Sequence, residues 1–269
     1  MREISRLLYL AQKQVTRLEY PYEKTTKIVA KNSRLGQSVT GVLQASEKQL
    51  NWMSHIYDYL SGLDEEYSAK HNLPKSVRLT TVQPSGTLSL LPGVTPGIHP
   101  SYAKFYIRRV RFRSTDPLVE ACRQRGYKVQ WDVGLDGQKD RTSQVVEFPC
   151  ESPENAVLAS EMSAVDQLEW IKRMQTEWAD NAVSVTVYYK MDELPEIQEW
   201  LQKNYKNSIK SVSFLLHTDH NFPLPPYEEI TEEEYEKSLA SVNLSVPLVA
   251  VGSDSVVFDD CNTGACPVR

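Results

Sequence analysis

The chain has 269 residues, of which 41% are hydrophobic and 24% charged, a balance that builds a core and excludes intrinsic disorder. Its formal net charge of −5 argues against a non-specific nucleic-acid binder. No uninterrupted apolar stretch approaches membrane length. The apolar region of a signal peptide does not follow Met1-Arg-Glu-Ile-Ser-Arg6, so no secretory signal is visible, and we expect a cytoplasmic protein without a membrane partner.

Apolar spacing and breaker residues predict the secondary structure along the chain. The alternation of strands with helices favours a parallel α/β arrangement, and from about residue 219 the sequence becomes Pro-rich and less regular. The predicted elements, in order, are helices 2–18 and 41–61, strands 77–83 and 104–112, helix 116–125, strands 127–133 and 143–149, helix 163–179, strand 182–189, helix 192–204, strand 211–217 and an acidic helix 228–241.

A turn with phosphate-binding chemistry follows the predicted strand 77–83. Pro84-Ser-Gly-Thr87 ends the strand, because proline removes a donor and glycine lets the backbone approach a ligand closely. Successive N–H groups flanked by two hydroxyls suit a phosphate, whose oxygens accept hydrogen bonds. An ordinary strand–turn–helix corner has the same ingredients, so the residues alone leave both readings open.

The four cysteines fall into two pairs of different character. Cys122 lies within a helical pattern and Cys150 ends a strand, and for both we favour the role of a small buried hydrophobe. Cys261 and Cys266 flank Asn-Thr-Gly-Ala in the last nine residues, where two thiols could close and reopen a disulfide. No further Cys or His lies beside them at zinc-ligand spacing, but a terminal segment can also be inert.

Histidines and arginines offer further candidates. His99 follows Gly-Ile and precedes Pro100, so it can simply cap a tight turn. His217 and His220 with Asp219 suggest a metal cluster, although a polar strand end is the favoured interpretation because no further ligand lies nearby. In the run Arg108-Arg-Val-Arg-Phe-Arg113, strand alternation places three arginines on one face. These could meet phosphates or form a surface ladder of salt bridges.

Four stretches of sequence together carry a family resemblance. They are Arg34-Leu-Gly-Gln-Ser-Val-Thr-Gly41; Gln83-Pro-Ser-Gly-Thr-Leu-Ser-Leu-Leu-Pro-Gly93 with Thr95-Pro-Gly-Ile-His-Pro100 and Tyr106-Ile-Arg-Arg-Val-Arg111; Asp180-Asn-Ala-Val-Ser-Val-Thr-Val-Tyr-Tyr189; and Asp260-Cys-Asn-Thr-Gly-Ala-Cys-Pro267. In this order they resemble the adenosylcobalamin-dependent (class II) ribonucleotide reductases, most closely the monomeric ribonucleoside-triphosphate reductases. The resemblance extends over essentially the whole chain but covers only the C-terminal portion of a typical family member.

The resemblance implies the ten-stranded α/β barrel of ribonucleotide reductases. Residues 1–218 would form the second half of that barrel, 219–258 a C-terminal segment near the cobalamin site, and 259–269 a mobile redox tail. Half of a barrel leaves strand edges unpaired, so we expect the chain to act with an N-terminal reductase portion.

The resemblance also implies roles for individual residues. A ribonucleoside triphosphate would bind through its phosphates to the turn, and adenosylcobalamin would contact the stretch from Thr95 and the region 215–254. The tail cysteines would pass electrons from a thioredoxin-type reductant to the active-site disulfide. The residues concerned are Ser85, Gly86, Thr87 and Leu88 for substrate, Gly97, His99 and His217 for the cofactor, and Cys261 and Cys266 for redox exchange. No Asp-x-His-x-x-Gly string is present, so that motif's histidine would not ligate the cobalamin.

One part of the family's chemistry has no counterpart here. The family generates a thiyl radical on a cysteine in an Asn-Pro-Cys-(Gly/Ala)-Glu string, whose glutamate is the general base, and this chain lacks such a string. Pro149-Cys-Glu151 has a passing likeness but follows the phosphate turn, against the family order. We therefore expect the C-terminal portion of a split, intein-interrupted or truncated reductase.

Two other classes of function stay open. A non-enzymatic nucleotide-binding or interaction module left by gene splitting would use the turn without radical chemistry. A thiol-redox protein would use the tail cysteines, although the usual Cys-x-x-Cys at a helix start is absent. A companion reading frame with Asn-Pro-Cys-x-Glu would favour the enzyme.

Overall fold

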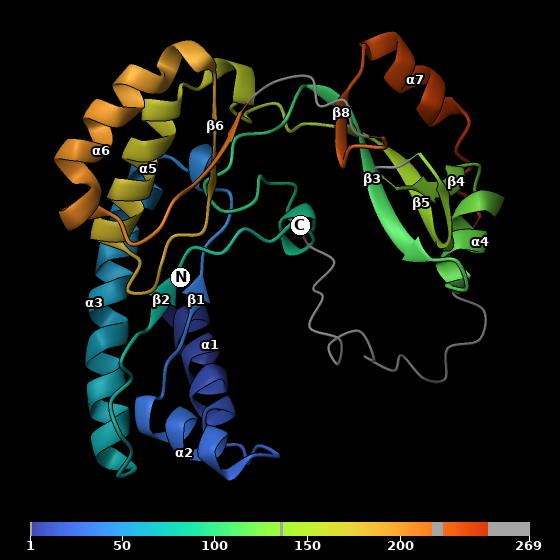
Figure 1. The fold of residues 1–269 in the computed structure, drawn as a ribbon. Coiled ribbons are helices and arrows are strands. Elements are labelled where there is room, and N and C mark those ends of the chain that lie inside the picture. The colour runs from blue at the N-terminus through green and yellow to red at the C-terminus, as the bar shows by residue number, and fades with distance from the viewer. Residues whose placement is uncertain (1, 135–136, 217–222, 247–269) are drawn as a thin grey trace. The chain divides into compact units, whose positions relative to one another are not determined.

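The structure, a computed structural model, describes residues 2–134, 137–216 and 223–246 and divides into two compact units (Figure 1). Unit 1 comprises Met1–Pro100 and Asn155–His217, and unit 2 comprises Ser101–Glu154 and Thr218–Arg269. The boundaries at 218/219 and 258/259 that the sequence suggests remain predictions.

Unit 1 is built from helices and short parallel strands. Its elements are α1 (Arg2–Val15), α2 (Glu23–Asn32), β1 (Gln37–Ser38), η1 (Val42–Gln44), α3 (Glu47–Lys70), β2 (Thr80–Thr81), η2 (Leu88–Leu90), η3 (Ala159–Glu161), α5 (Ala164–Glu177), β6 (Thr186–Tyr189), η4 (Met191–Glu193), α6 (Leu194–Ser208) and β7 (Ser213–Leu216).

The strands of unit 1 form a run of parallel segments. β1 pairs with β2 in parallel, and β6 pairs with β7 in parallel. A parallel bridge between Val82 and Val183 links β2 to the segment that leads into β6. This run confirms the predicted α/β class, and among the described residues it stays an open sheet.

The core of unit 1 lies where α3 and α5 meet the strands. α3 begins with a capping box, in which the Ser46 hydroxyl accepts a hydrogen bond from the Gln49 backbone N–H, an arrangement that satisfies otherwise unpaired donors. Apolar side chains at helical spacing then point inward, as the sequence predicts. Fully or nearly fully buried members include Leu50, Leu60, Leu168, Ile171, Met174, Val82, Val183 and Val187.

α1 is attached to α3 through its polar side. Lys13 Nζ lies 2.8 Å from Asp64 Oδ1, and both side chains are almost completely buried. Asp64 Oδ1 also accepts a hydrogen bond from the Tyr9 hydroxyl at 2.9 Å, and Asp64 Oδ2 accepts one from the Ser76 backbone N–H at 2.7 Å. One carboxylate therefore holds α1, α3 and the loop before β2 together.

Unit 2 is an antiparallel sheet with two helices. Its strand order is β4-β5-β3-β8, and every pairing is antiparallel. The predicted parallel arrangement is wrong here, because β4 and β5 join through a short hairpin connection and parallel neighbours need a long crossover. Its elements are β3 (Phe105–Arg113), α4 (Pro117–Gln124), β4 (Lys128–Val133), β5 (Lys139–Glu151), β8 (Tyr227–Glu229) and α7 (Glu232–Ala240).

Several boundaries differ from those that the sequence predicts. A strand is expected over residues 77–83, but strand pairing is limited to Thr80–Thr81 and a single bridge at Val82. α2 was not predicted, because it buries none of its residues and shows no apolar stripe. None of the helices in the described part of the chain is long and apolar enough to span a membrane.

Candidate functional site

The candidate site lies at the carboxyl ends of β1 and β2. The Ser38 hydroxyl oxygen at the end of β1 accepts a hydrogen bond from the Gln83 backbone N–H at 2.9 Å. The Ser85–Thr87 turn follows immediately after Gln83 and Pro84. In parallel α/β sheets, ligands bind beyond the carboxyl ends of the strands, so the fold places the predicted phosphate turn at a ligand-binding edge.

Two loops from distant parts of the sequence are joined beneath this turn. The Thr40 hydroxyl donates to the Thr95 carbonyl oxygen at 3.0 Å and accepts from the Gly97 N–H at 3.1 Å. The Gln44 side-chain carbonyl accepts the Thr95 N–H at 2.8 Å. The loop after β1 therefore fixes the backbone of Thr95–Gly97.

Two glycines in these loops are required by their backbone geometry. Gly41 and Gly97 have φ angles of +67° and +59°, a region that side chains with a Cβ rarely adopt. A Cβ at Gly41 would lie 2.8 Å from Val94 Cβ, and one at Gly97 would lie 3.3 Å from Val82 Cγ1. The close packing of the two loops depends on both glycines.

The turn itself presents several hydrogen-bond donors. The Ser85 hydroxyl oxygen accepts the Leu88 N–H at 2.9 Å, which leaves the hydroxyl proton available. Within the described residues, the backbone N–H groups of Gly86 and Thr87 have no hydrogen-bond acceptor, and Thr87 is exposed. The Leu88 N–H, predicted to bind phosphate, is engaged by Ser85 in this conformation.

Gly86 differs from the other glycines of the region. Among the described glycines of residues 36–97, positive φ angles occur at Gly41, Gly93 and Gly97 but not at Gly86. A larger residue at 86 would therefore strain no left-handed backbone. The predicted role of Gly86, to let a ligand approach the backbone closely, stays a prediction.

His99 links the loop to the start of β6. Its Nδ1 lies 3.1 Å from the Pro96 carbonyl oxygen, and its Nε2 accepts the Thr186 backbone N–H at 3.1 Å. These partners assign a neutral ring with the proton on Nδ1. Burial lowers the pKa of His99 below 6.5, against a smaller raising effect of the Pro96 carbonyl.

The residues predicted to bind the cofactor are thus occupied by internal contacts. Both ring nitrogens of His99 are engaged, and the Gly97 N–H and carbonyl bond Thr40 and Val42. Because the His99 ring and both backbone groups of Gly97 are engaged in this conformation, these two residues fit a corrin as residues that shape the loop. His217 lies outside the described residues.

The cysteines of the described part are unreactive in character. Cys122 is buried and Cys150 half-buried, and both are free thiols. Burial raises the pKa of each thiol, which lowers the fraction of reactive thiolate. Both agree with the structural role favoured from the sequence, whereas Cys261 and Cys266 lie outside the described residues.

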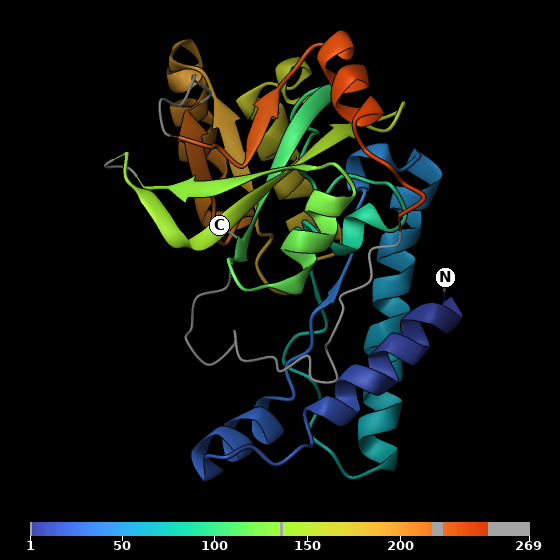
Figure 2. The ribbon, with the colours of Figure 1, turned by 90° about the vertical axis from the view of Figure 1, so that its right-hand side faces the viewer.

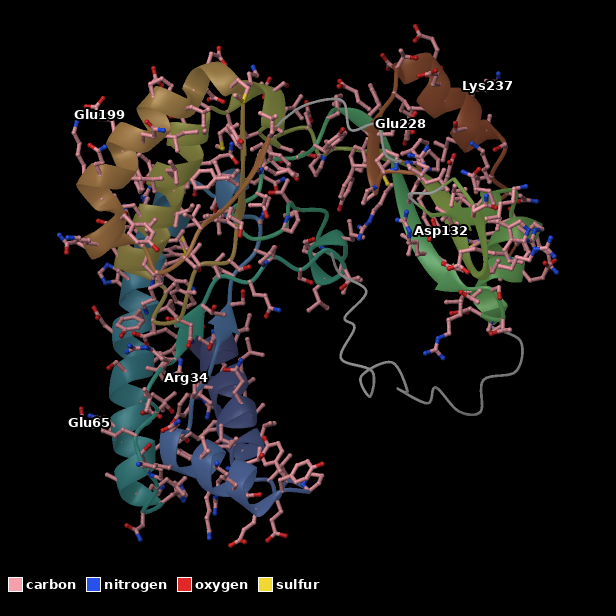
Figure 3. All side chains as sticks on the ribbon, viewed as in Figure 1. Arg34, Glu65, Asp132, Glu199, Glu228 and Lys237 are labelled. Carbon is pink, nitrogen blue, oxygen red and sulfur yellow. The ribbon has the colours of Figure 1, made fainter. Side chains whose placement is uncertain are left out.

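The arginine run on β3 forms salt bridges. Arg109 pairs with Glu147 at 2.9 Å and with Glu228, and Arg111 Nε lies 2.9 Å from Asp132. Figure 3 labels Asp132 and Glu228, the carboxylates on either side of this strand. For Arg109 and Arg111, the ladder of salt bridges is the reading that the structure supports.

Sequence reasoning missed residues that hold the strand run together. Asp180 accepts hydrogen bonds from the Tyr57 hydroxyl at 2.9 Å and the Leu79 N–H at 3.0 Å. The Asn181 side-chain amide donates to the Leu35 and Thr80 carbonyls, both at 2.8 Å. The only signal in the sequence was the Asp180-Asn181 pair at the head of a stretch quoted for its resemblance.

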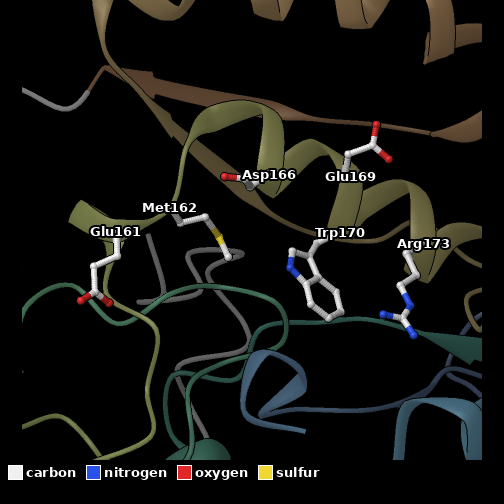
Figure 4. Close-up of a pocket in the computed structure, with 6 residues that line it drawn as sticks. All are labelled: Glu161, Met162, Asp166, Glu169, Trp170 and Arg173. Carbon is white, nitrogen blue, oxygen red and sulfur yellow. The ribbon is translucent and has the colours of Figure 1, made fainter. Parts of the chain in front are cut away.

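A hollow elsewhere in unit 1 does not suit a phosphate. Three acidic side chains contribute to its lining, and Arg173, its only cation, already binds Glu47 at 2.8 Å and Glu177 at 3.2 Å. An anionic ligand would meet net negative charge there. Figure 4 shows the six lining residues, Glu161, Met162, Asp166, Glu169, Trp170 and Arg173.

Comparison with known proteins agrees with this reading of the fold. Residues 63–215 match the family model of the ribonucleotide reductase barrel domain. The adenosylcobalamin-dependent ribonucleoside-triphosphate reductase of Lactobacillus gasseri is 30% identical over 310 residues, covering 100% of this chain and 41% of that protein. The reductase of the same name from Levilactobacillus brevis is 30% identical over 300 residues, covering 96% and 39%.

A solved structure shows the same relationship in three dimensions. The crystal structure of a B12-dependent (class II) ribonucleotide reductase superposes with a TM-score of 0.76 at 26% sequence identity, covering 93% of this chain and 40% of that one. The chain thus spans about two fifths of the length of the relatives that it matches. Since the barrel-domain match extends over more than half of its residues, the chain belongs to the ribonucleotide reductase family.

Proposed function

We propose that this chain is the C-terminal portion of an adenosylcobalamin-dependent reductase that converts ribonucleoside triphosphates to 2′-deoxyribonucleotides by thiyl-radical chemistry. It supplies the substrate-phosphate loop, part of the cobalamin site and the redox-shuttle cysteines Cys261 and Cys266. The radical-bearing cysteine and its general base belong to the N-terminal portion. The family membership and the names of the relatives support this proposal.

The observation that carries the proposal is the set of free donors after β2. The donors are the Ser85 hydroxyl proton, the N–H groups of Gly86 and Thr87 and the Thr87 hydroxyl, and they all belong to one turn, in which Ser85 and Gly86 are half-buried and Thr87 is exposed. Phosphate oxygens accept several hydrogen bonds at once and donate none. The Leu88 N–H would join them when the Ser85 hydroxyl turns from it to the phosphate.

The cofactor has a limited place in the proposal. When bound, adenosylcobalamin would supply the radical that activates the cysteine of the N-terminal portion. The part of Gly97 and His99 is to keep the loop of residues 94–99 in place, through Thr40 and Thr186. His217 is a further proposed contact.

The experiment removes the donors and the space of the turn in the assembled enzyme. Gly86→Val with Thr87→Val should raise the KM for the ribonucleoside triphosphate about 10- to 100-fold, because hydrogen bonds to a charged group are lost. Thr176→Val is the matched control, since the Thr176 hydroxyl is exposed and bonds only within α5, to the Lys172 carbonyl. An unchanged KM in the double variant would reject the phosphate assignment.

A further inference from the structure

The helix α1 exposes its apolar side. Its outward residues recur at spacings of three and four, which is the spacing of one helical stripe. Each large member is between 46% and 60% exposed. Single exposed hydrophobic residues are common on protein surfaces, but a continuous exposed stripe is unusual. The stripe, named here the α1 stripe, consists of Ile4, Leu7, Leu8, Val15 and, just beyond the helix, Leu18.

The orientation of α1 is fixed by its opposite, polar side. The buried residues of the helix are Ser5, Tyr9 and Lys13, and the last two bind the buried carboxylate of Asp64. Turning the apolar side inward would leave Asp64 buried without its ammonium partner, which costs several kcal/mol. The contacts with Asp64 therefore keep the α1 stripe on the outside of unit 1.

No element of unit 1 covers the stripe among the described residues. Figure 2 shows α1 crossing in front of α3 on the side that faces the viewer, in agreement with the contact between these two helices. α1 also contacts β1, which among the described residues has a strand partner on one side only. Helix α1 thus lies at the edge of the described parallel run.

Two buried acceptors in the same region also lack donors. Among the described residues, the side-chain carbonyl oxygens of Gln12 on α1 and Gln37 on β1 are buried without a hydrogen-bond partner. A buried acceptor without a donor is costly. Since both oxygens are inaccessible from outside unit 1, they take no part in a contact with the α1 stripe.

The α1 stripe alone is too small for a stable interface. From Ile4 to Leu18 a helix rises about 21 Å, so with a helix width of about 10 Å the stripe offers on the order of 200 Å². A stable interface buries about 800 Å² on each partner. The covering partner must therefore extend well past α1, as a large part of a barrel would.

We propose that the α1 stripe is a docking surface for the part of the reductase that its relatives carry outside the matched region, which presents an apolar face to α1. More than half of the relatives' length lies outside that region, and an open parallel sheet needs further strands to close a barrel. This inference rests on the proposed function, because the docking partner is the N-terminal portion named there.

Sedimentation velocity can test the docking without substrate or cofactor. The full chain is mixed with a separately produced polypeptide that carries the rest of the reductase from the same organism. Leu8→Glu with Val15→Glu should weaken the complex at least about 100-fold, since two carboxylates would enter an apolar contact. Met191→Glu is the matched control, because Met191 is 61% exposed on η4, and it should bind as the unaltered chain does.

Each other result would overturn the inference. Binding of the stripe variant at unaltered strength, or no complex with any chain, would exclude the docking surface. A self-associated chain that the two substitutions make monomeric would identify a second copy as the occupant. A thermal midpoint several degrees lower in the variant would mean that the stripe packs internally. Reductase activity that is insensitive to the stripe would reject the docking surface and leave the proposed function standing.

Discussion

His99 joins two parts of unit 1 only while its ring is neutral. Its Nε2 accepts the Thr186 N–H. A proton on Nε2 would turn that atom into a donor facing the Thr186 donor, so the hydrogen bond would be lost. Burial is the main reason why the pKa of His99 lies below its ordinary value of 6.5. The unfolded chain therefore takes up this proton more readily than the folded chain.

This difference predicts a pH dependence of stability. The contribution of His99 should be fully present above pH 6.5 and be lost as the pH falls below that value towards the folded-state pKa. Urea unfolding of the full chain at pH 7.5 and 5.5 measures it. His99→Gln should show a smaller loss between the two pH values than the unaltered chain, and equal losses in both would contradict the assignment.

The tail cysteines should be needed for repeated turnover. Thiol–disulfide exchange requires one sulfur to attack the active-site disulfide and a second to resolve the mixed disulfide, so that the tail pair is oxidised as the active-site pair is reduced. In the assembled enzyme, Cys261→Ser or Cys266→Ser should abolish multiple turnovers with thioredoxin but leave a single turnover of pre-reduced enzyme. A small dithiol should restore part of the activity, and normal turnover of both variants with thioredoxin would refute the shuttle.

The turn could be predicted from the sequence, but the contacts beneath it could not. Ser85-Gly-Thr87 is a local pattern, and its hydrogen-bond donors can be identified from the residue types alone. The Thr40 contacts to Thr95 and Gly97 span 55 and 57 residues, so they exist only after β1 and β2 pair in parallel. For the same reason His99 looked like a ligand contact, since its bond to Thr186 spans 87 residues.

At the scale of elements, the joint between α1 and α3 depends on Asp64. Burial disfavours its charged form, but hydrogen bonds from Lys13, Ser76 and Tyr9 outweigh burial and lower the pKa of Asp64. Asp64→Ala would leave the Lys13 ammonium buried and unpaired. We predict a loss of about 3–5 kcal/mol in the free energy of unfolding, measured by urea titration.

An exposed neighbour supplies the control for this prediction. Glu65 follows Asp64 on α3 and pairs with Lys75 at 2.8 Å, with more than half of each side chain in solvent. Such pairs contribute about 0–1 kcal/mol, so Glu65→Ala should change stability little. Equal effects of the two substitutions would show that the buried pair does not hold α1.

Periodicity predicted the long elements well and the pairing of strands poorly. α3 and α5 bury regularly spaced positions, and their existence and type follow from that pattern. α2 buries none of its residues, so its sequence lacks the apolar spacing from which a helix is predicted. The direction of pairing in unit 2 depends on which strands are neighbours, and β5 lies between β4 and β3, a fact that no local spacing encodes.

At the scale of the whole molecule, the chain is a family member that spans about two fifths of its relatives. Its parallel run is open, its apolar helix side is uncovered in the described residues, and its sequence has no Asn-Pro-Cys-(Gly/Ala)-Glu string. All three features are accounted for by an enzyme that needs a further portion. Catalysis should therefore require both portions together.

The most direct test is a complementation assay. The chain, a polypeptide that carries the Asn-Pro-Cys-(Gly/Ala)-Glu cysteine from the same organism, and their mixture are each supplied with ribonucleoside triphosphate, adenosylcobalamin and a small dithiol. Chromatography then measures the 2′-deoxyribonucleotide formed. The account predicts product in the mixture and none from either polypeptide alone. Product from this chain alone, or none from a mixture in which the two polypeptides have formed a complex, would contradict it.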